Sequence, residues 1–162
     1  MTSFAGRRVL LDANLLLLLL IGSIDRSLFD TNKRIRKYSA REFFLLNECL
    51  REAKVLMTTG HVNSQASDLG AGSLTGQYRQ TFLDLLRAMH ENNTALLMTA
   101  DEVHQPILSL NASVLRELGV ADAGLINATR ESSGVLFTDD LPLYLMAQRH
   151  GVEAVNFSHL LQ

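Results

Sequence analysis

Short apolar runs alternate with longer segments of helical periodicity from one end of this chain to the other. These runs are too short for helices and are typical of strands that are buried on both faces. They are residues 9–11, 55–58, 134–138 and 153–157. Because parallel strands need long crossover connections, usually helices, the alternation predicts an α/β fold with three layers, α/β/α, around a mostly parallel central sheet.

The segments between these runs carry the signals of helices. The leucine-rich stretch after Asp12 is long enough for a buried helix, and Ser39 and Glu42 have the spacing of a capping box at the start of another. Further helices are expected near residues 61–69, around 82–89, over 121–131 and over 141–150, the last of them stopped by Gly151.

Two segments are less regular. The glycine-rich residues 70–76 are expected to form a loop. Residues 94–110, which Pro106 interrupts, favour neither a helix nor a strand.

The composition indicates one ordinary globular domain, residues 1–162, with 47% hydrophobic and 20% charged residues. This balance excludes disorder as the main state, because a disordered chain is poor in apolar residues and strongly charged. Cys49 is the single cysteine, which excludes an internal disulfide framework and a zinc site built of cysteines. We expect Cys49 to be a small, buried hydrophobic residue.

The N-terminal region superficially resembles a signal peptide, because Arg7 and Arg8 precede the apolar residues 15–21. Asp12 and Asn14, however, lie inside the would-be apolar region. The uninterrupted run has seven residues, whereas a membrane-spanning helix needs about 20. We therefore expect a core segment of a cytoplasmic protein that does not engage a membrane.

Carboxylates follow two of the expected strands. Asp12 follows the first run, Asp139 and Asp140 follow the third, and Asp122 lies at the start of a later helix. Ligands of open α/β sheets bind at the carboxyl ends of the strands. Carboxylates that converge there repel one another unless a cation lies between them, and hard divalent cations such as Mg²⁺ take oxygen ligands. The pattern therefore indicates a metal-dependent site.

Each acid also has a purely structural interpretation. Asp122 suits the N-terminal end of a helix equally well, because acids are favourable there. Asp139 and Asp140 are candidates to cap the helix that follows them, and for Asp139 the capping role is favoured over that of a metal ligand. Asp12 is the hardest to explain in this way, since a lone acid between apolar runs has a desolvation cost unless it has a partner or a metal.

Three short motifs, taken together in their order and spacing, resemble the PIN domain. They are Val9-Leu10-Leu11-Asp12-Ala13-Asn14, Gly119-Val120-Ala121-Asp122-Ala123 and Leu136-Phe137-Thr138-Asp139-Asp140. The resemblance covers nearly the whole chain. Members of this family are Mg²⁺- or Mn²⁺-dependent nucleases that act mostly on single-stranded RNA, and they include the toxins of many bacterial toxin–antitoxin pairs.

The resemblance implies roles for individual residues. Asp12, Asp122 and Asp140 would be the catalytic acids and the metal ligands. The supporting positions would be Asn14, Gln65, Thr138 and Asp139, with Asn14 accompanying the first acid and the Thr138 hydroxyl orienting the site.

Gln65 is a departure from the family pattern. The family places a glutamate at the end of a Thr-Pro-x-Val-x-x-Glu-like stretch, to which Thr59-Gly60-His61-Val62-Asn63-Ser64-Gln65 corresponds. A neutral amide cannot act as a base and holds a cation less strongly than a carboxylate. Asp68 lies three residues further along the same helical face and is a shorter-reaching substitute.

The resemblance to the PIN domain, together with the pattern of acids, implies a Mg²⁺- or Mn²⁺-dependent endoribonuclease, active or attenuated, that hydrolyses phosphodiester bonds of single-stranded or structured RNA. A protein antitoxin and a second copy of the chain are the candidate protein partners. Two alternatives stay open. One is a degenerate PIN fold that binds RNA or protein without cutting, which Gln65 favours. The other is a structure-specific DNA nuclease.

The charge pattern gives a weaker signal. The net charge of −2 argues against binding nucleic acid through bulk charge, although it allows a local basic patch. Such a cluster lies at Lys33, Arg34, Arg36, Lys37 and Arg41. It is either a phosphate-contacting surface or, as is commoner, a solvated loop and helix entry. The five histidines have no metal-ligand spacing, and His61 is the one expected near the acids.

Overall fold

The structure is a computed structural model that describes residues 4–91 and 112–161. The irregular stretch 94–110 lies outside the described residues. The strands are β1 (Arg8–Leu11), β2 (Val55–Met57), β3 (Val135–Thr138) and β4 (Ala154–Asn156). The helices are α1 (Ala13–Gly22), α2 (Leu28–Thr31), α3 (Ala40–Leu50), α4 (Gly60–Ala71), α5 (Gly76–Glu91), α7 (Ala112–Leu118), α8 (Val120–Glu131), α9 (Leu141–Arg149) and the short 3₁₀ helix η1 (Phe157–Leu161).

The described strands form a single parallel sheet with the order β2-β1-β3-β4. Val9 of β1 lies opposite Leu56 on one side and Val135 on the other. From β1 the chain crosses first to β2 on one side and later to β3 on the other. The order therefore reverses between β1 and β3, and the carboxyl ends of these two strands form the crevice in which open α/β sheets bind ligands.

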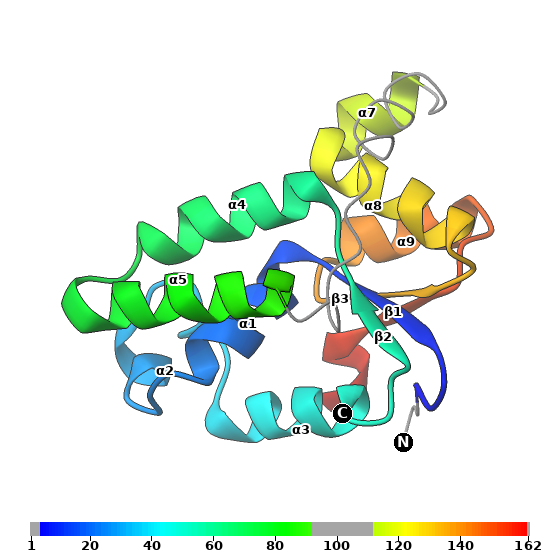
Figure 1. Ribbon diagram of the computed structural model, residues 1–162. Coiled ribbons are helices and arrows are strands. Elements are labelled where there is room, and N and C mark those ends of the chain that lie inside the picture. The colour runs from blue at the N-terminus through cyan, green and yellow to red at the C-terminus, as the bar shows by residue number, and fades with distance from the viewer. Residues whose placement is uncertain (1–3, 92–111, 162) are drawn as a thin grey trace.

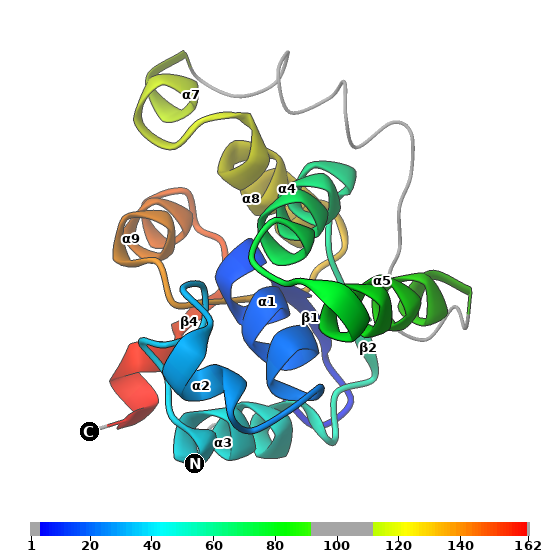
Figure 2. The ribbon, with the colours of Figure 1, turned by 90° about the vertical axis from the view of Figure 1, so that its left-hand side faces the viewer.

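Helices cover both faces of the sheet, which confirms the predicted three-layer α/β/α fold. α8 and α9 lie on one side of the strands, and α3 lies on the opposite side with the C-terminal segment (Figure 1). The view turned by 90° shows the same arrangement, with α1 in the centre between α3, α4 and α5 (Figure 2).

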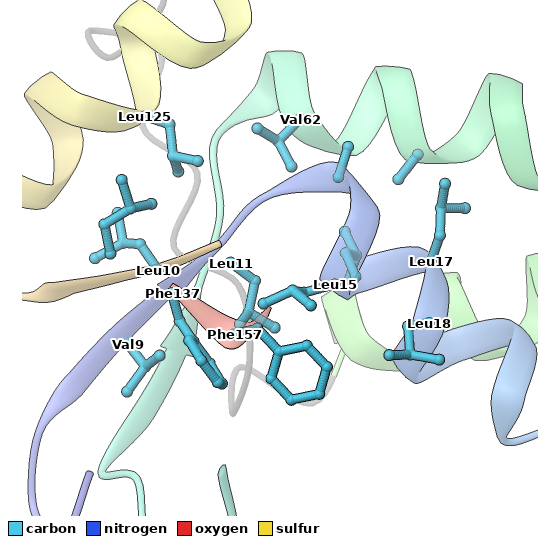
Figure 3. Packing of buried hydrophobic residues seen from close by; sticks show 14 of the residues in the cluster. Val9, Leu10, Leu11, Leu15, Leu17, Leu18, Val62, Leu125, Phe137 and Phe157 are labelled. Atoms are coloured by element: carbon cyan, nitrogen blue, oxygen red, sulfur yellow. The ribbon is translucent and has the colours of Figure 1, made fainter. Parts of the chain in front are cut away.

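The core is built around the two central strands and α1. Side chains of β1 and β3 point toward those of α1, α4, α8 and η1 (Figure 3). The rings of Phe137 and Phe157 meet edge to face with their centroids 5.6 Å apart. Leu15, Leu17 and Leu18 are each no more than 1% exposed, because helices surround α1 instead of leaving one side to water.

The glycine-rich segment differs from the loop expected over residues 70–76. α4 continues to Ala71 and α5 begins at Gly76, so the loop comprises only residues 72–75. Gly70 is a packing position inside α4, because a Cβ there would lie 2.1 Å from the ring of Phe82 in α5. The glycine thus permits two helices to approach closely.

The sequence patterns missed some short elements and misplaced a few ends. α2 and α7 were not predicted, since neither is long enough to show a clear period. The last strand ends at Asn156, and Phe157 begins η1 instead of closing the strand. Among the helices in the described ranges, none is long and apolar enough to cross a membrane.

Candidate functional site

Asp12 lies at the carboxyl end of β1 and caps the N-terminus of α1. Its Oδ1 accepts a hydrogen bond from the backbone N–H of Leu15 at 2.8 Å. Its Oδ2 accepts one from the Thr138 hydroxyl and one from the backbone N–H of Asp139 at 3.2 Å. The residue is 3% exposed. Burial raises the pKa of Asp12 above its ordinary value, although these three hydrogen bonds favour the charged form.

Thr138, the last residue of β3, connects Asp12 with Asp140. Its hydroxyl donates to Oδ2 of Asp12 and accepts from the backbone N–H of Asp140 at 2.9 Å. Thr138 has no exposed surface, because β3 is fully buried between its neighbours. The carboxyl ends of β1 and β3 are therefore joined by side-chain as well as backbone contacts.

Asp140 caps α9, and Asp139 does not. Oδ1 of Asp140 accepts a hydrogen bond from the backbone N–H of Leu143 at 2.9 Å. The expectation that Asp139 is a helix cap is therefore wrong. The N-cap residue has extended backbone geometry with its side chain turned back to the first helical turn, and Asp140 occupies that position with ψ of 112°.

The carboxylate of Asp139 instead binds donors from two other segments of the chain. It accepts hydrogen bonds from Lys37 at 2.8 Å, from the Tyr38 hydroxyl at 2.7 Å and from the Ser158 hydroxyl. Burial opposes its charged form, but these donors outweigh burial and hold the pKa of Asp139 below its ordinary value. Sequence reasoning missed Tyr38 and Ser158, because neither lies in a motif near Asp139.

Asp122, the third predicted acid, lies in the first turn of α8. Burial, followed by repulsion from Asp140 and Asp12, raises the pKa of Asp122 to about 6. The structure therefore places Asp140 and Asp12 close enough to Asp122 to raise its pKa. We call Asp12, Asp122 and Asp140 the acidic edge.

The remaining predicted positions lie less centrally. Asn14 is half-buried in the first turn of α1. Gln65 and Asp68 are exposed on α4. In the part of the chain that the structure describes, no hydrogen bond joins Gln65 to the acidic edge. His61 is half-buried in the first turn of α4.

A divalent cation would need carboxylate oxygens that protein donors leave free. Within residues 4–91 and 112–161, no three His, Cys, Asp or Glu side chains are arranged to hold one metal ion together. Asp12 uses three of its roughly four acceptor sites on protein donors. Mg²⁺ usually keeps several waters and binds through one or two carboxylates. A pair formed by Asp122 and Asp140, whose charges interact, fits that chemistry.

The basic cluster lies beside these acids. Lys33, Arg36, Lys37 and Arg41 are exposed, and Arg34 is half-buried. Lys37 forms an ion pair with Asp139, whose backbone N–H binds Asp12. Lys37 therefore connects the cluster to Asp12 through Asp139.

These features define a three-layer α/β protein with paired carboxylates at the switch point of a parallel sheet. No protein-family model matches this chain, and a search of curated proteins finds no match.

Proposed function

We propose that this protein is a Mg²⁺- or Mn²⁺-dependent endoribonuclease of PIN type that hydrolyses phosphodiester bonds of single-stranded or structured RNA. The observation that carries the proposal is the convergence of Asp12, Asp122 and Asp140 where β1 and β3 end, with the pKa of Asp122 raised first by burial and then by repulsion from Asp140 and Asp12. Acids that repel one another in this way are costly to keep together unless a cation offsets their charge.

Each residue of the site would have a separate role in the proposed hydrolysis. Asp122 and Asp140 would hold the cation. A bound divalent cation supplies Lewis acidity and lowers the pKa of a bound water, which is the chemistry that phosphodiester hydrolysis needs. Asp12 would accept hydrogen bonds from water at its remaining lone pair. Thr138 would keep the carboxyl ends of β1 and β3 in fixed register, because its hydroxyl is bonded to both.

Cleavage of a mixed-sequence single-stranded RNA with Mn²⁺ tests the proposal. Asp122→Asn is the most informative variant, because it removes a ligand while relieving charge repulsion. We expect it to fold at least as well as the wild type and to lose about a hundredfold or more in rate, as for removal of a key electrostatic group. Asp84→Asn, which neutralises an exposed acid on α5, is the matched control and should cut normally.

Asp12→Asn should also lose cleavage, but it replaces an acceptor of the Thr138 and Asp139 donors and is expected to lower stability as well. Equal cleavage by the wild type and Asp122→Asn would rule the acidic edge out as the active site. Comparison with a DNA strand of the same sequence separates a ribonuclease from a DNA nuclease.

A binding protein without nuclease activity is the second candidate. Gln65 favours it, since a neutral amide stands where the PIN pattern has a glutamate. Gln65→Glu separates the two functions. A gain of cutting in this variant, starting from a weak or silent wild type, identifies an attenuated nuclease. If neither protein cuts RNA or binds Mn²⁺, the nuclease proposal fails and the binding function becomes the leading candidate.

A protein partner is also proposed for this edge, either an antitoxin or a second copy of the chain. Large apolar side chains flank the acids: Leu141 is 50% exposed directly after Asp140, and Val120 is 39% exposed near Asp122. Sedimentation of the wild type and of Leu145→Glu, which alters a 42% exposed neighbour on α9, tests self-association. A monomeric wild type at high concentration would contradict the homodimer. We propose the cytoplasm as the compartment, in keeping with the single cysteine.

A further inference from the structure

Three segments that are distant in the sequence meet at the carboxylate of Asp139. Lys37 and Tyr38 come from the loop between α2 and α3, and Ser158 comes from η1. The backbone N–H of the same residue donates to Asp12. Asp139 therefore connects this loop and the C-terminal segment to Asp12, the first two through its side chain and Asp12 through its backbone N–H.

The carboxylate of Asp139 is buried and stays negatively charged. The Asp139 side chain is 7% exposed, whereas that of its partner Lys37 is 51% exposed. Tyr38 is 6% exposed and packs edge to face against Phe157, with centroids 6.3 Å apart. A buried carboxylate without its cation would be strongly unfavourable. The ion pair and the two hydroxyl donors therefore form an anchor that holds the loop in one place.

Exposed basic residues lie close in the sequence to the anchored Lys37. We call residues 33–41 the basic segment. Arg36 precedes the anchored Lys37 directly, and Lys33 and Arg41 lie four residues to either side of it. Consecutive Cα atoms are about 3.8 Å apart, so Arg36 cannot lie far from the anchor. The basic segment is thus attached at Lys37 to Asp139, the residue whose backbone N–H binds Asp12, although the chain as a whole has a net charge of −2.

We propose that Asp139 is a positioning residue that holds the basic segment beside the acidic edge, where its exposed cations bind the phosphates of single-stranded RNA. The proposal depends on the proposed function only for the choice of RNA as the ligand. Phosphate contacts give affinity and fix the position of a strand without reading its bases. The basic segment would accordingly set the register of the backbone relative to Asp122 and Asp140.

The change in net charge and the loss of positioning predict opposite changes in RNA affinity for Asp139→Asn. The substitution removes a negative charge, so bulk electrostatics alone predicts tighter RNA binding. Loss of the anchor predicts weaker binding, because the loop then pays an ordering entropy when it binds. Tyr38→Phe removes one donor to Asp139 and no charge, so any change in RNA affinity there arises from positioning.

The experiment measures the dissociation constant of a fluorescently labelled single-stranded oligoribonucleotide in EDTA, over a range of salt concentrations. We expect Asp139→Asn to weaken binding about fivefold and Tyr38→Phe about twofold. Arg36→Ala should weaken binding and reduce the slope of log affinity against log salt by about 0.7, the value for one phosphate contact on a single strand. Lys54→Ala removes an exposed cation at the amino end of β2, at the opposite edge of the sheet, and should leave the slope unchanged.

Unfolding curves of each variant accompany the titrations, so that weaker binding is not confused with unfolding. If Asp139→Asn does not fold, Tyr38→Phe decides the matter by itself. Wild-type affinity or tighter binding in the folded variants would overturn the positioning role, as would equal salt slopes for Arg36→Ala and Lys54→Ala. RNA binding that depends on Asp139 without any cutting in Mn²⁺ would keep this inference and refute the nuclease. RNA cleavage that is unchanged in Asp139→Asn and Tyr38→Phe would support the nuclease and refute this inference.

Discussion

The hydroxyl of Thr138 has no exposed surface and makes one donated and one accepted hydrogen bond, to Asp12 and from Asp140. Together with the backbone N–H of Asp139, it provides both donors at Oδ2 of Asp12. Burial raises the pKa of Asp12, and these donors limit the rise. The protonation of the acidic edge therefore depends on a residue that carries no charge.

Replacement of Thr138 tests this dependence. Thr138→Val keeps the shape of the side chain and leaves Oδ2 of Asp12 without its hydroxyl donor. We expect a loss of about 1–3 kcal/mol in unfolding free energy, the cost of an unsatisfied buried polar group. We also expect a higher pKa for Asp12, measured by carbon NMR of the carboxyl group. Thr138→Ser retains the hydroxyl, and a loss as large as that of Thr138→Val would contradict the hydrogen-bond explanation.

The raised pKa of Asp122 predicts how stability depends on pH in the metal-free protein. Its pKa is about 6 in the folded state and 3.8 in the reference state. The folded state thus binds the proton more tightly, so the stabilisation is complete below about pH 4 and is lost as pH rises through about 6. Urea unfolding in EDTA should show a loss of roughly 2 kcal/mol across this window.

Asp122→Asn provides the comparison, because it cannot titrate. Its unfolding free energy should vary less between pH 4 and 6 than that of the wild type, and any remaining slope of the same sign is expected from Asp12. Added Mn²⁺ should restore stability of the wild type at neutral pH. A wild-type stability that increases with pH over this range would contradict the repulsion among the acids.

Helix packing depends on small residues at specific points. α4 and α5 approach each other where Gly70 meets the ring of Phe82, which is fully buried. Similarly, a Cβ at Gly22, the last residue of α1, would lie 2.7 Å from the ring of Phe43 in α3. These contacts explain why a helix can pass through a glycine that its own propensity disfavours.

Gly70→Ala is expected to lower the unfolding free energy by about 1–3 kcal/mol, the usual cost of overpacking. Chemical denaturation measures this loss. Phe82→Leu provides space for the new methyl group, so the double variant should lose less than the sum of the two single losses. Strict additivity would show that Gly70 is needed for another reason.

The molecule as a whole is organised by its four described strands, with β1 and β3 inside and β2 and β4 at the edges. β3 and all but Arg8 of β1 are buried, whereas the residues of β2 and β4 are partly exposed except Met57 and Asn156. Stability should therefore decrease from the centre of the sheet outward.

Hydrogen exchange provides the measurement. We expect the amides of Leu10, Leu136 and Phe137 to exchange only through global unfolding, and those of β2 and β4 to exchange at lower free energy through local opening. Equal protection across all four strands would indicate that the sheet opens as one unit.

The amino-acid sequence by itself determined the class of the fold, because its signals are local. Buried strands show as short apolar runs, and the capping box at Ser39 and Glu42 fixes the start of α3. The rule that the carboxyl ends of parallel strands lie at one edge of the sheet also predicted that Asp12 and the acids after the third run lie close together. The hydrogen bond from the backbone N–H of Asp139 to Asp12 joins these two places across 127 residues of sequence. Gly70 and the short helix α2 fell outside such patterns, since their placement depends on neighbours from other elements.

The tertiary structure alone decided which side chains meet across the crossovers. Lys37 and Asp139 are 102 residues apart, and no periodicity in either segment indicates the pair. Likewise the partners that Asp139 has in place of α9, the hydroxyls of Tyr38 and Ser158, come from segments that the sequence around Asp139 does not indicate. Local patterns report the period and burial of each element. Contacts such as these depend on how the loops return to the sheet, which is fixed only when the layers pack.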